Sequence, residues 1–306
     1  MRSSLDCLPC FIRQALDACR MITRDEEQIA RVMRDIMAAI SNFDLNLTPP
    51  ETGRIIHRII RHQLNAPDPY RHLKIMSNQR ALALEECVRG IIRQSGHPFE
   101  TAVKFAIAGN ILDFGMKSSW DEDLIMSTFD KTQRIELNRE MVQELYHAAS
   151  NAQRILVLGD NAGETVFDRL MIENFPGTAS VFYAVKASPV INDATMTEAI
   201  ESGLDRVATL ISTGDDGAGT VLKNGSAEFV DCYRRADLII AKGQANFETL
   251  SDSADRIYFL LQIKCPVIGH HYGYPLGAWL VTSTWAKHPA HQETNHAVTH
   301  PQSIHV

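Results

Sequence analysis

The chain has 306 residues, a formal net charge of −7 at pH 7 and a sequence pI near 5.9. Its length allows one large domain or two smaller ones, and its acidic balance argues against nucleic acid or an anionic membrane as a partner. No apolar run approaches the roughly 18 residues that cross a bilayer, and the N-terminus lacks the apolar segment of a signal peptide. We therefore expect a cytoplasmic protein whose six cysteines are mostly reduced.

Cys7 and Cys10 are the only close pair of cysteines. The apolar residues that follow have helical spacing, and Pro9 suits the first turn of a helix. Cys10 would then lie near the positive end of the helix dipole, which favours its thiolate. A structural zinc usually needs four ligands, and this pair supplies two. Two interpretations stay open: packed thiols, or a metal or redox role completed by Cys87 or Cys265.

The first 150 residues carry apolar side chains at helical spacing and predict a mostly helical N-terminal part. Thr48 and Glu51 form a capping-box pattern at the start of one of these helices. The predicted helices cover residues 25–41, 48–60, 70–94, 99–112 and 122–150. Asn110 and Asp113 lie three residues apart at the end of the helix over 99–112, where they either cap the helix or point into a site.

From residue 151 the pattern changes to short apolar strands that alternate with helices, which is typical of a parallel α/β sheet. We predict strands over 155–158, 180–185, 206–211, 237–243 and 256–262. This α/β core is expected to span residues 151–285. The last segment, 286–306, carries five histidines among polar residues and is predicted to be a flexible tail.

The segment Ile155–Glu164 is the most informative stretch of the chain. Four apolar residues form a buried strand, Gly159 ends it, and Asp160 and Asn161 follow where the strand emerges from the sheet. A helix is expected to start at about Ala162. The two polar residues either cap that helix or present oxygen ligands at the sheet edge where α/β proteins bind ligands.

Polar residues also follow three other predicted strands. A parallel sheet brings all of these strand ends to one edge. Carboxylate and amide oxygens there suit Mg²⁺ or Mn²⁺, and lysines suit the oxygens of a phosphate. The glycine-rich loop after Ser212 offers exposed amides to an anion, while Asn192 or Asp193 is expected to cap a helix near Ala194. The polar clusters are Asp160/Asn161, Lys186 with Asn192/Asp193, Ser212/Thr213, and Lys242 with Asn246.

Taken together, these motifs resemble the acidic-residue-methyltransferase-like family, now regarded as metal-dependent damage-control phosphatases. The resemblance spans nearly the whole chain, and the Cys-x-x-Cys pair marks its prokaryotic branch. It implies a Rossmann-like three-layer α/β core with a mostly parallel sheet, preceded by an all-helical N-terminal part. The matching segments are Cys7–Cys10, Gly109–Phe114, Gly159–Glu164, Val190–Asp193, Lys242–Glu248 and Lys264–Pro266.

The resemblance also implies a divalent metal (Mn²⁺, Mg²⁺, Ni²⁺ or Co²⁺) on Asp160, Asn161 and Asp193, with Lys242 on the substrate phosphate. We expect the metal to assist attack of water on a small phosphorylated metabolite, with Glu164 or Asp113 handling the proton. The candidate substrate-binding residues are Asn110, Lys186, Ser212, Lys242 and Asn246.

Two other functions remain alternatives at this stage. One is a non-catalytic binding module that responds to metal or redox state through the cysteine pair. The other is a methyltransferase, as the name of the family suggests, although no Gly-x-Gly loop for adenosylmethionine follows the first strand. A haloacid-dehalogenase phosphatase fits poorly, because Ala162 stands where that class has its second aspartate.

Overall fold

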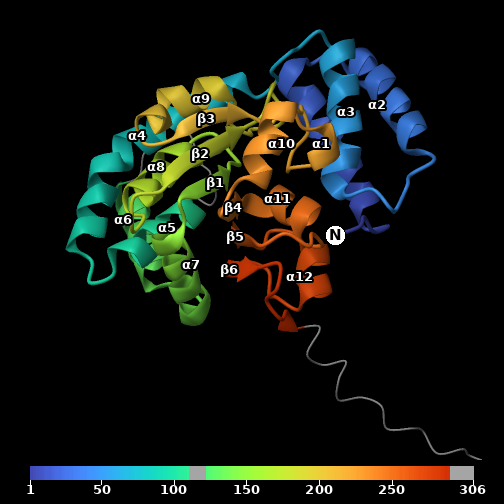
Figure 1. Cartoon of the computed structure of the whole chain (residues 1–306). Coiled ribbons are helices and arrows are strands. Elements are labelled where there is room, and N and C mark those ends of the chain that lie inside the picture. The colour runs from blue at the N-terminus through green and yellow to red at the C-terminus, as the bar shows by residue number, and fades with distance from the viewer. Residues whose placement is uncertain (110–121, 290–306) are drawn as a thin grey trace, which may run out of the picture.

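The computed structural model describes residues 1–109 and 122–289, and a six-stranded sheet lies at its centre (Figure 1). The strands follow the order β3-β2-β1-β4-β5-β6. The first five are parallel and β6 is antiparallel to β5. Their bounds are β1 Arg154–Leu158, β2 Ser180–Val185, β3 Thr209–Ser212, β4 Leu238–Lys242, β5 Ile257–Gln262 and β6 Trp279–Ser283.

Helices cover both faces of this sheet because side chains alternate along each buried strand. In β1, Ile155 and Val157 pack into one apolar core, and Leu156 and Leu158 pack into another. The first core is shared with α4 (Arg71–Gln94), α5 (Pro98–Ala108), α7 (Arg139–Asn151), α8 (Glu164–Glu173) and α9 (Met196–Glu201). The second is shared with α10 (Ala227–Arg234), α11 (Gly243–Leu250) and α12 (Pro266–Tyr272). The predicted three-layer α/β core is thereby confirmed.

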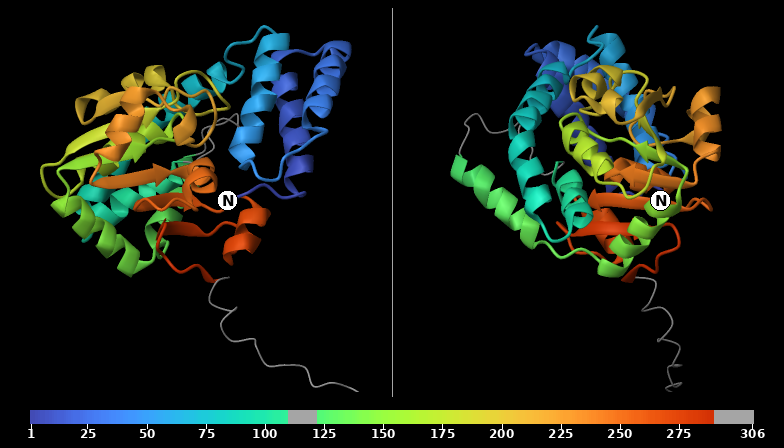
Figure 2. Two further views of the ribbon diagram at one scale, coloured as in Figure 1. Left: turned by 45° about the vertical axis from the view of Figure 1, so that its right-hand side comes forward. Right: turned by 60° about the vertical axis from the view of Figure 1, so that its left-hand side comes forward.

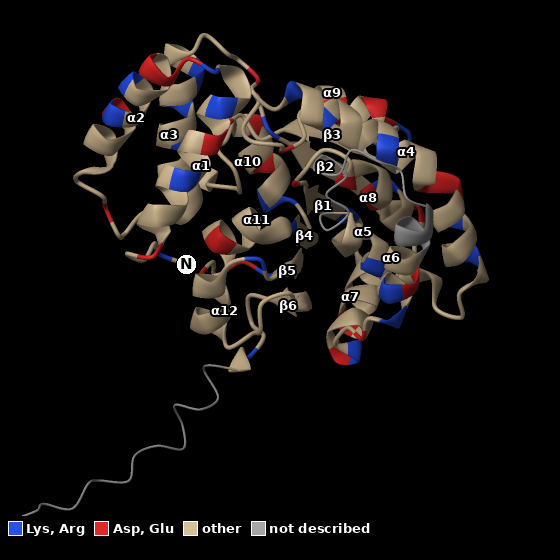
Figure 3. Ribbon diagram, turned by 180° about the vertical axis from the view of Figure 1, so that it is seen from behind, with Lys and Arg blue, Asp and Glu red and all other residues tan. Residues whose placement is uncertain are grey.

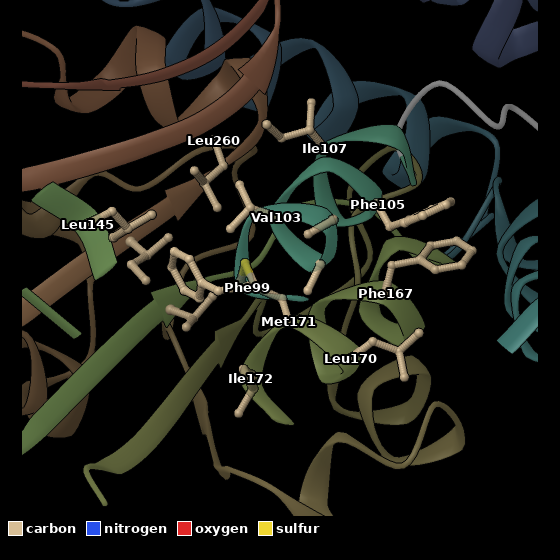
Figure 4. Packing of buried hydrophobic residues seen from close by; sticks show 14 of the residues in the cluster. Phe99, Val103, Phe105, Ile107, Leu145, Phe167, Leu170, Met171, Ile172 and Leu260 are labelled. Carbon is tan, nitrogen blue, oxygen red and sulfur yellow. The ribbon is translucent and has the colours of Figure 1, made fainter. Parts of the chain in front are cut away.

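The contact between α5 and α8 forms much of the first core. Figure 4 shows side chains of both helices meeting beside Leu145 of α7 and Leu260 of β5. The labelled residues are Phe99, Val103, Phe105 and Ile107 of α5, and Phe167, Leu170, Met171 and Ile172 of α8. Helix α5 thereby packs the N-terminal half of the chain against α8, the helix that follows β1 and the candidate site.

Helices α1 (Cys7–Ile22), α2 (Glu26–Ile40) and α3 (Pro49–Gln63) form a bundle with an apolar core of its own. The predicted capping box at the start of α3 is present, with Thr48 and Glu51 as its members. In the left view of Figure 2 this bundle stands beyond the ends of the strands, and α3 contacts α11. The helical half of the chain therefore contains one bundle beside the sheet and further helices packed on it.

Several predicted elements have different bounds. The segment 122–150 forms two helices, α6 (Glu122–Arg134) and α7, because the Asn138 side chain caps a new helix by accepting from the Met141 amide. A 3₁₀ turn occupies 204–206, so β3 begins only at Thr209. Helix α12 and strand β6 were not predicted.

None of the helices within 1–109 and 122–289 is long and apolar enough to cross a membrane. On the side shown in Figure 3, Lys and Arg alternate with Asp and Glu along helices such as α2 and α4. At the C-terminal end, His288 is 8% exposed and its ring contacts Phe247 and Tyr272. The packed chain thus reaches His288. Most of the predicted tail lies outside the described residues, and the predicted domain boundaries stay predictions.

Candidate active site

Asp160 and Asn161 emerge from β1 at the carboxyl edge of the sheet. Helix α8 begins at Glu164, and its N-cap is Gly163, whose φ of 83° is readily adopted by glycine and which makes no side-chain cap. Neither Asp160 nor Asn161 therefore caps α8, which was one of the two interpretations of this motif. Both side chains remain at the strand end, where Asp160 is buried and Asn161 is partly buried.

Asp193 reaches the same place from the loop that follows β2. It forms an isolated antiparallel bridge with Asn161, and the Ala194 amide donates to the Asp160 carbonyl at 2.8 Å. The expectation that Asn192 or Asp193 caps a helix near Ala194 is wrong. Helix α9 starts two residues later, because Thr195 and Glu198 form its capping box. Asp193 is thereby left to face Asn161.

The two carboxylates are buried together, with Asp160 6% and Asp193 3% exposed. Burial, followed by the charge of Asp193, raises the pKa of Asp160 to about 7. Burial also raises the pKa of Asp193 to about 6, against the attraction of Lys186. The Oδ2 atom of Asp193 has no hydrogen-bond partner among the described residues, and the nearest cation, Lys186 Nζ, is 3.7 Å away. A site with these properties favours a cation between the carboxylates.

Lys242, the last residue of β4, is fully buried and interacts electrostatically with Asp160. Its Nζ donates to the Ala106 carbonyl at 2.7 Å, to Glu164 Oε2 at 3.2 Å and to Asp168 Oδ1 at 2.6 Å. Burial by itself lowers the pKa of Lys242, but the attraction of Asp168 and Glu164 outweighs it and raises the pKa above its ordinary value. All three ammonium donors are therefore used within the protein. The role of Lys242 on substrate phosphate stays a prediction.

Asp168 was missed by the sequence analysis. It is fully buried on α8, and its Oδ2 accepts a hydrogen bond from the Tyr183 hydroxyl at 2.7 Å. Its position four residues after Glu164, on the same side of one helix, was the available signal. The two carboxylates clamp Lys242 from α8, while Glu164 Oε1 accepts from the Asn161 amide at 2.7 Å. Burial raises the pKa of Glu164 to about 8 despite Lys242.

Lys186 and Asn246 complete the strand ends around the carboxylates. The Lys186 ammonium is buried beside Asp193 and donates to the Gly219 carbonyl. The Asn246 amide donates to the Gly159 carbonyl at 3.1 Å and to the Lys242 carbonyl at 2.7 Å, so it ties the ends of β1 and β4 together. Ser212 lies farther away, at the end of β3, two strands from β1, where its hydroxyl accepts from the Gly214 amide.

Gly243 allows the Asp160 carboxylate to approach the backbone. Its φ is 78°, and a Cβ atom placed there would lie 1.9 Å from Asp160 Oδ2. Any side chain at this position would displace the carboxylate. Lys264, from the end of β5, also acts on Asp160, because its positive charge lowers the pKa of that carboxyl against the effect of burial. Lys264 was not predicted as a site residue, although it too follows a buried strand.

The cysteine pair does not behave as its helix position suggested. Cys7 is buried and Cys10 is exposed. Although the residue as a whole is exposed, partial burial of the Cys10 thiol, followed by Cys265, Cys7 and Glu248, raises its pKa, which is the opposite of the expected preference for thiolate. Within residues 1–109 and 122–289, no group of three or more His, Cys, Asp or Glu side chains is arranged to hold a metal. A site of two aspartates and one asparagine is outside that kind of group.

Glu248 of α11 is a buried carboxyl close to the cysteines, and it provides a test by pH. Burial raises its pKa from an ordinary value of 4.5 to about 7. A raised folded-state pKa means that stability is lost as the pH rises through about 7. We expect Glu248→Gln to be more stable than the wild type by roughly 1–3 kcal/mol at pH 8, with a smaller difference at pH 5. Urea unfolding at both pH values measures this, and equal gains at the two values would contradict it.

Asn110 and Asp113, the two predicted site residues on the N-terminal half, lie outside the described residues. The other predicted residues divide into two groups. Ser212 lies two strands away from β1. The residues that meet at one edge of the sheet are Asp160, Asn161, Glu164, Lys186, Asp193, Lys242 and Asn246.

Known proteins are similar to this chain in sequence and in fold. The damage-control phosphatase ARMT1-like domain matches residues 3–280. A damage-control phosphatase of Pyrococcus horikoshii is 36% identical over 91% of this chain and 96% of that protein. An uncharacterized protein of Methanocaldococcus jannaschii is 34% identical over 89% of this chain and 92% of its own length. The crystal structure of a DUF89 family protein from P. horikoshii superimposes with a TM-score of 0.87 at 32% identity, covering 93% of this chain and 99% of that one.

Proposed function

Since the chain belongs to the damage-control phosphatase ARMT1-like family, we propose that it is a metal-dependent phosphatase that hydrolyses small phosphorylated metabolites. The observation that carries the proposal is the pair of buried carboxylates, Asp160 and Asp193, held beside Asn161 by backbone bonds between two strand ends. Such a pair is costly to keep charged unless a cation lies between its members.

The residues present fit a hard divalent cation. Asp160 and Asp193 supply carboxylate oxygens, and the Asn161 amide nitrogen points to Asp160 and Glu164, which leaves its carbonyl oxygen as the ligand. Of these oxygens, Asp193 Oδ2 is buried without a hydrogen bond among the described residues, and its ion pair with Lys186 is long, at 3.7 Å, so it is available to a cation. When bound, the cation would polarise a phosphoryl oxygen and lower the pKa of a water molecule.

The protein's own groups would act around the phosphoryl group. Lys264 and Lys186, which both interact electrostatically with the carboxylates, would offset negative charge that develops on the phosphoryl oxygens. Lys242 would hold Glu164 in place through its hydrogen bond to Oε2. Glu164, which also contacts Asn161, would accept the proton of the attacking water or donate one to the leaving group. We expect water to attack the phosphorus directly, without a phosphorylated aspartate, because Ala162 stands where dehalogenase-type phosphatases have their second aspartate.

Metal reconstitution tests the proposal. Protein stripped with a chelator is expected to lose hydrolysis of p-nitrophenyl phosphate and to regain it when Mg²⁺, Mn²⁺, Co²⁺ or Ni²⁺ is added. Cys7→Ser serves as the control, because Cys7 lies on the α1–α3 bundle and not among the strand-end carboxylates; its metal response should match the wild type. A stripped protein that stays inactive with all four metals, toward p-nitrophenyl phosphate and sugar phosphates alike, would refute the proposal.

A further inference from the structure

Ile191 has an unusual backbone conformation next to the candidate metal site. Its φ is 45°, in the left-handed region, and it is a β-branched residue. The other non-glycine residue with positive φ in the described part of the chain is Asn65, a type that tolerates this region. A branched side chain is strained there, and such strain persists only where the surroundings hold it.

The α1–α3 bundle holds this residue. The Ile191 side chain packs against the apolar core of α1–α3, and it is not part of the two cores that flank the sheet. Arg61 of α3 binds the same loop, because its Nη1 donates to the Pro189 carbonyl at 3.0 Å. The other nitrogen, Nη2, pairs with Asp216 in the loop after β3 at 2.6 Å. The bundle therefore fixes the loop after β2 through one apolar and one polar contact.

The same loop carries Asp193, one of the three proposed ligands. The Asn192 carbonyl accepts from the Ala162 amide at 2.9 Å, and the Asp193 amide donates to the Val190 carbonyl at 3.1 Å across a tight turn that includes Ile191. Asp193 then pairs with Asn161. A change in the backbone at Ile191 would rotate the following peptides, so it would move Asp193 relative to the end of β1.

We propose that Ile191 is a positioning residue: its packing on the α1–α3 bundle holds the left-handed turn that places Asp193 opposite Asn161. The inference rests on the proposed function for the identity of the ligand, and it gives the N-terminal bundle a role at the site. Ile191 is not proposed to touch the metal or the substrate. It acts through the loop alone.

Three variants separate positioning from general stability. Ile191→Ala removes the apolar contact and leaves a residue that still disfavours the left-handed region, whereas Ile191→Leu keeps an apolar side chain of the same size. Val32→Ala is the matched control, because Val32 is a 1% exposed member of the same bundle core on α2. Two quantities are measured on each full-length protein: hydrogen exchange of the Ala162 and Asp193 amides, and binding of Mn²⁺ followed by the electron paramagnetic resonance signal of the free ion.

Ile191→Ala is expected to speed exchange of both amides at least about tenfold and to weaken Mn²⁺ binding by about the same factor, with little change in Tm. Val32→Ala should lower Tm and leave both quantities unchanged, and Ile191→Leu should stay close to the wild type. Wild-type exchange in Ile191→Ala would overturn the inference. So would wild-type Mn²⁺ affinity of that variant, where the wild type itself binds Mn²⁺. If the wild type itself binds no Mn²⁺, the proposed function fails, and the exchange rates alone decide whether Ile191 positions the loop.

Discussion

Asp160→Asn is expected to lower kcat/KM for phosphate-ester hydrolysis by at least about 10³-fold, or ~4 kcal/mol of transition-state stabilisation. The substitution keeps the shape of the side chain but removes one of two carboxylates that would hold the cation. Burial and Asp193 raise the pKa of Asp160 to about 7, which means that its charged form is unfavourable in the folded protein. Asparagine carries no such charge. The Tm of the metal-free variant should therefore equal or exceed that of the wild type. Steady-state kinetics and thermal unfolding, with and without Mn²⁺, measure both effects.

The same substitution at the opposite edge of the sheet provides the control. Asp237 precedes β4 and accepts hydrogen bonds from the Gln153 and Arg154 amides. Asp237→Asn should keep its activity and the increase in Tm that Mn²⁺ produces, both of which Asp160→Asn should lose. An active Asp160→Asn enzyme would show that Asp160 is not a metal ligand. An inactive variant with a much lower Tm would show that Asp160 serves the fold instead.

Lys242→Met is expected to have the largest effect on stability. The substitution leaves Glu164 and Asp168 buried without the cation that both contact. Removal of one partner from a buried ion pair costs about 3–5 kcal/mol, which is a large share of the roughly 5–15 kcal/mol that stabilises a domain. Urea unfolding at pH 7 measures the loss. Because methionine is close to lysine in length and apolar, a cavity contributes little.

Two further variants identify the cause of that loss. Adding Asp168→Asn to Lys242→Met removes one of the two carboxylates that have lost their ion-pair partner, so part of the stability should return. Lys223→Met is the control: its ion pair with Glu51 lies at the surface, where the Lys223 side chain is 69% exposed, and the change should matter little. If Lys242→Met were as stable as Lys223→Met, the ion pairs beneath the site would contribute nothing to the fold.

The elements at the site were predicted most accurately where local chemistry and tertiary structure agree. The four apolar residues before Gly159 lie in β1, which begins one residue earlier at Arg154, and the capping box at Thr48 starts α3. Elements that depend on distant partners were missed. Strand β6 is stabilised by pairing with β5 at the edge of the sheet, and nothing in its own sequence requires that partner. The break between α6 and α7 depends on one asparagine cap.

The site shows the same division. The sequence by itself determined which residues follow buried strands, and a parallel sheet necessarily collects them at one edge; Asp160, Asn161, Asp193, Lys186 and Lys242 were identified in this way. It did not determine which of them pair. Only the tertiary structure decided that Lys242 pairs with Glu164 and Asp168, and that Ile191 packs against the α1–α3 bundle. Direction and partner depend on contacts between segments far apart in the chain, and local sequence patterns carry no information about those contacts.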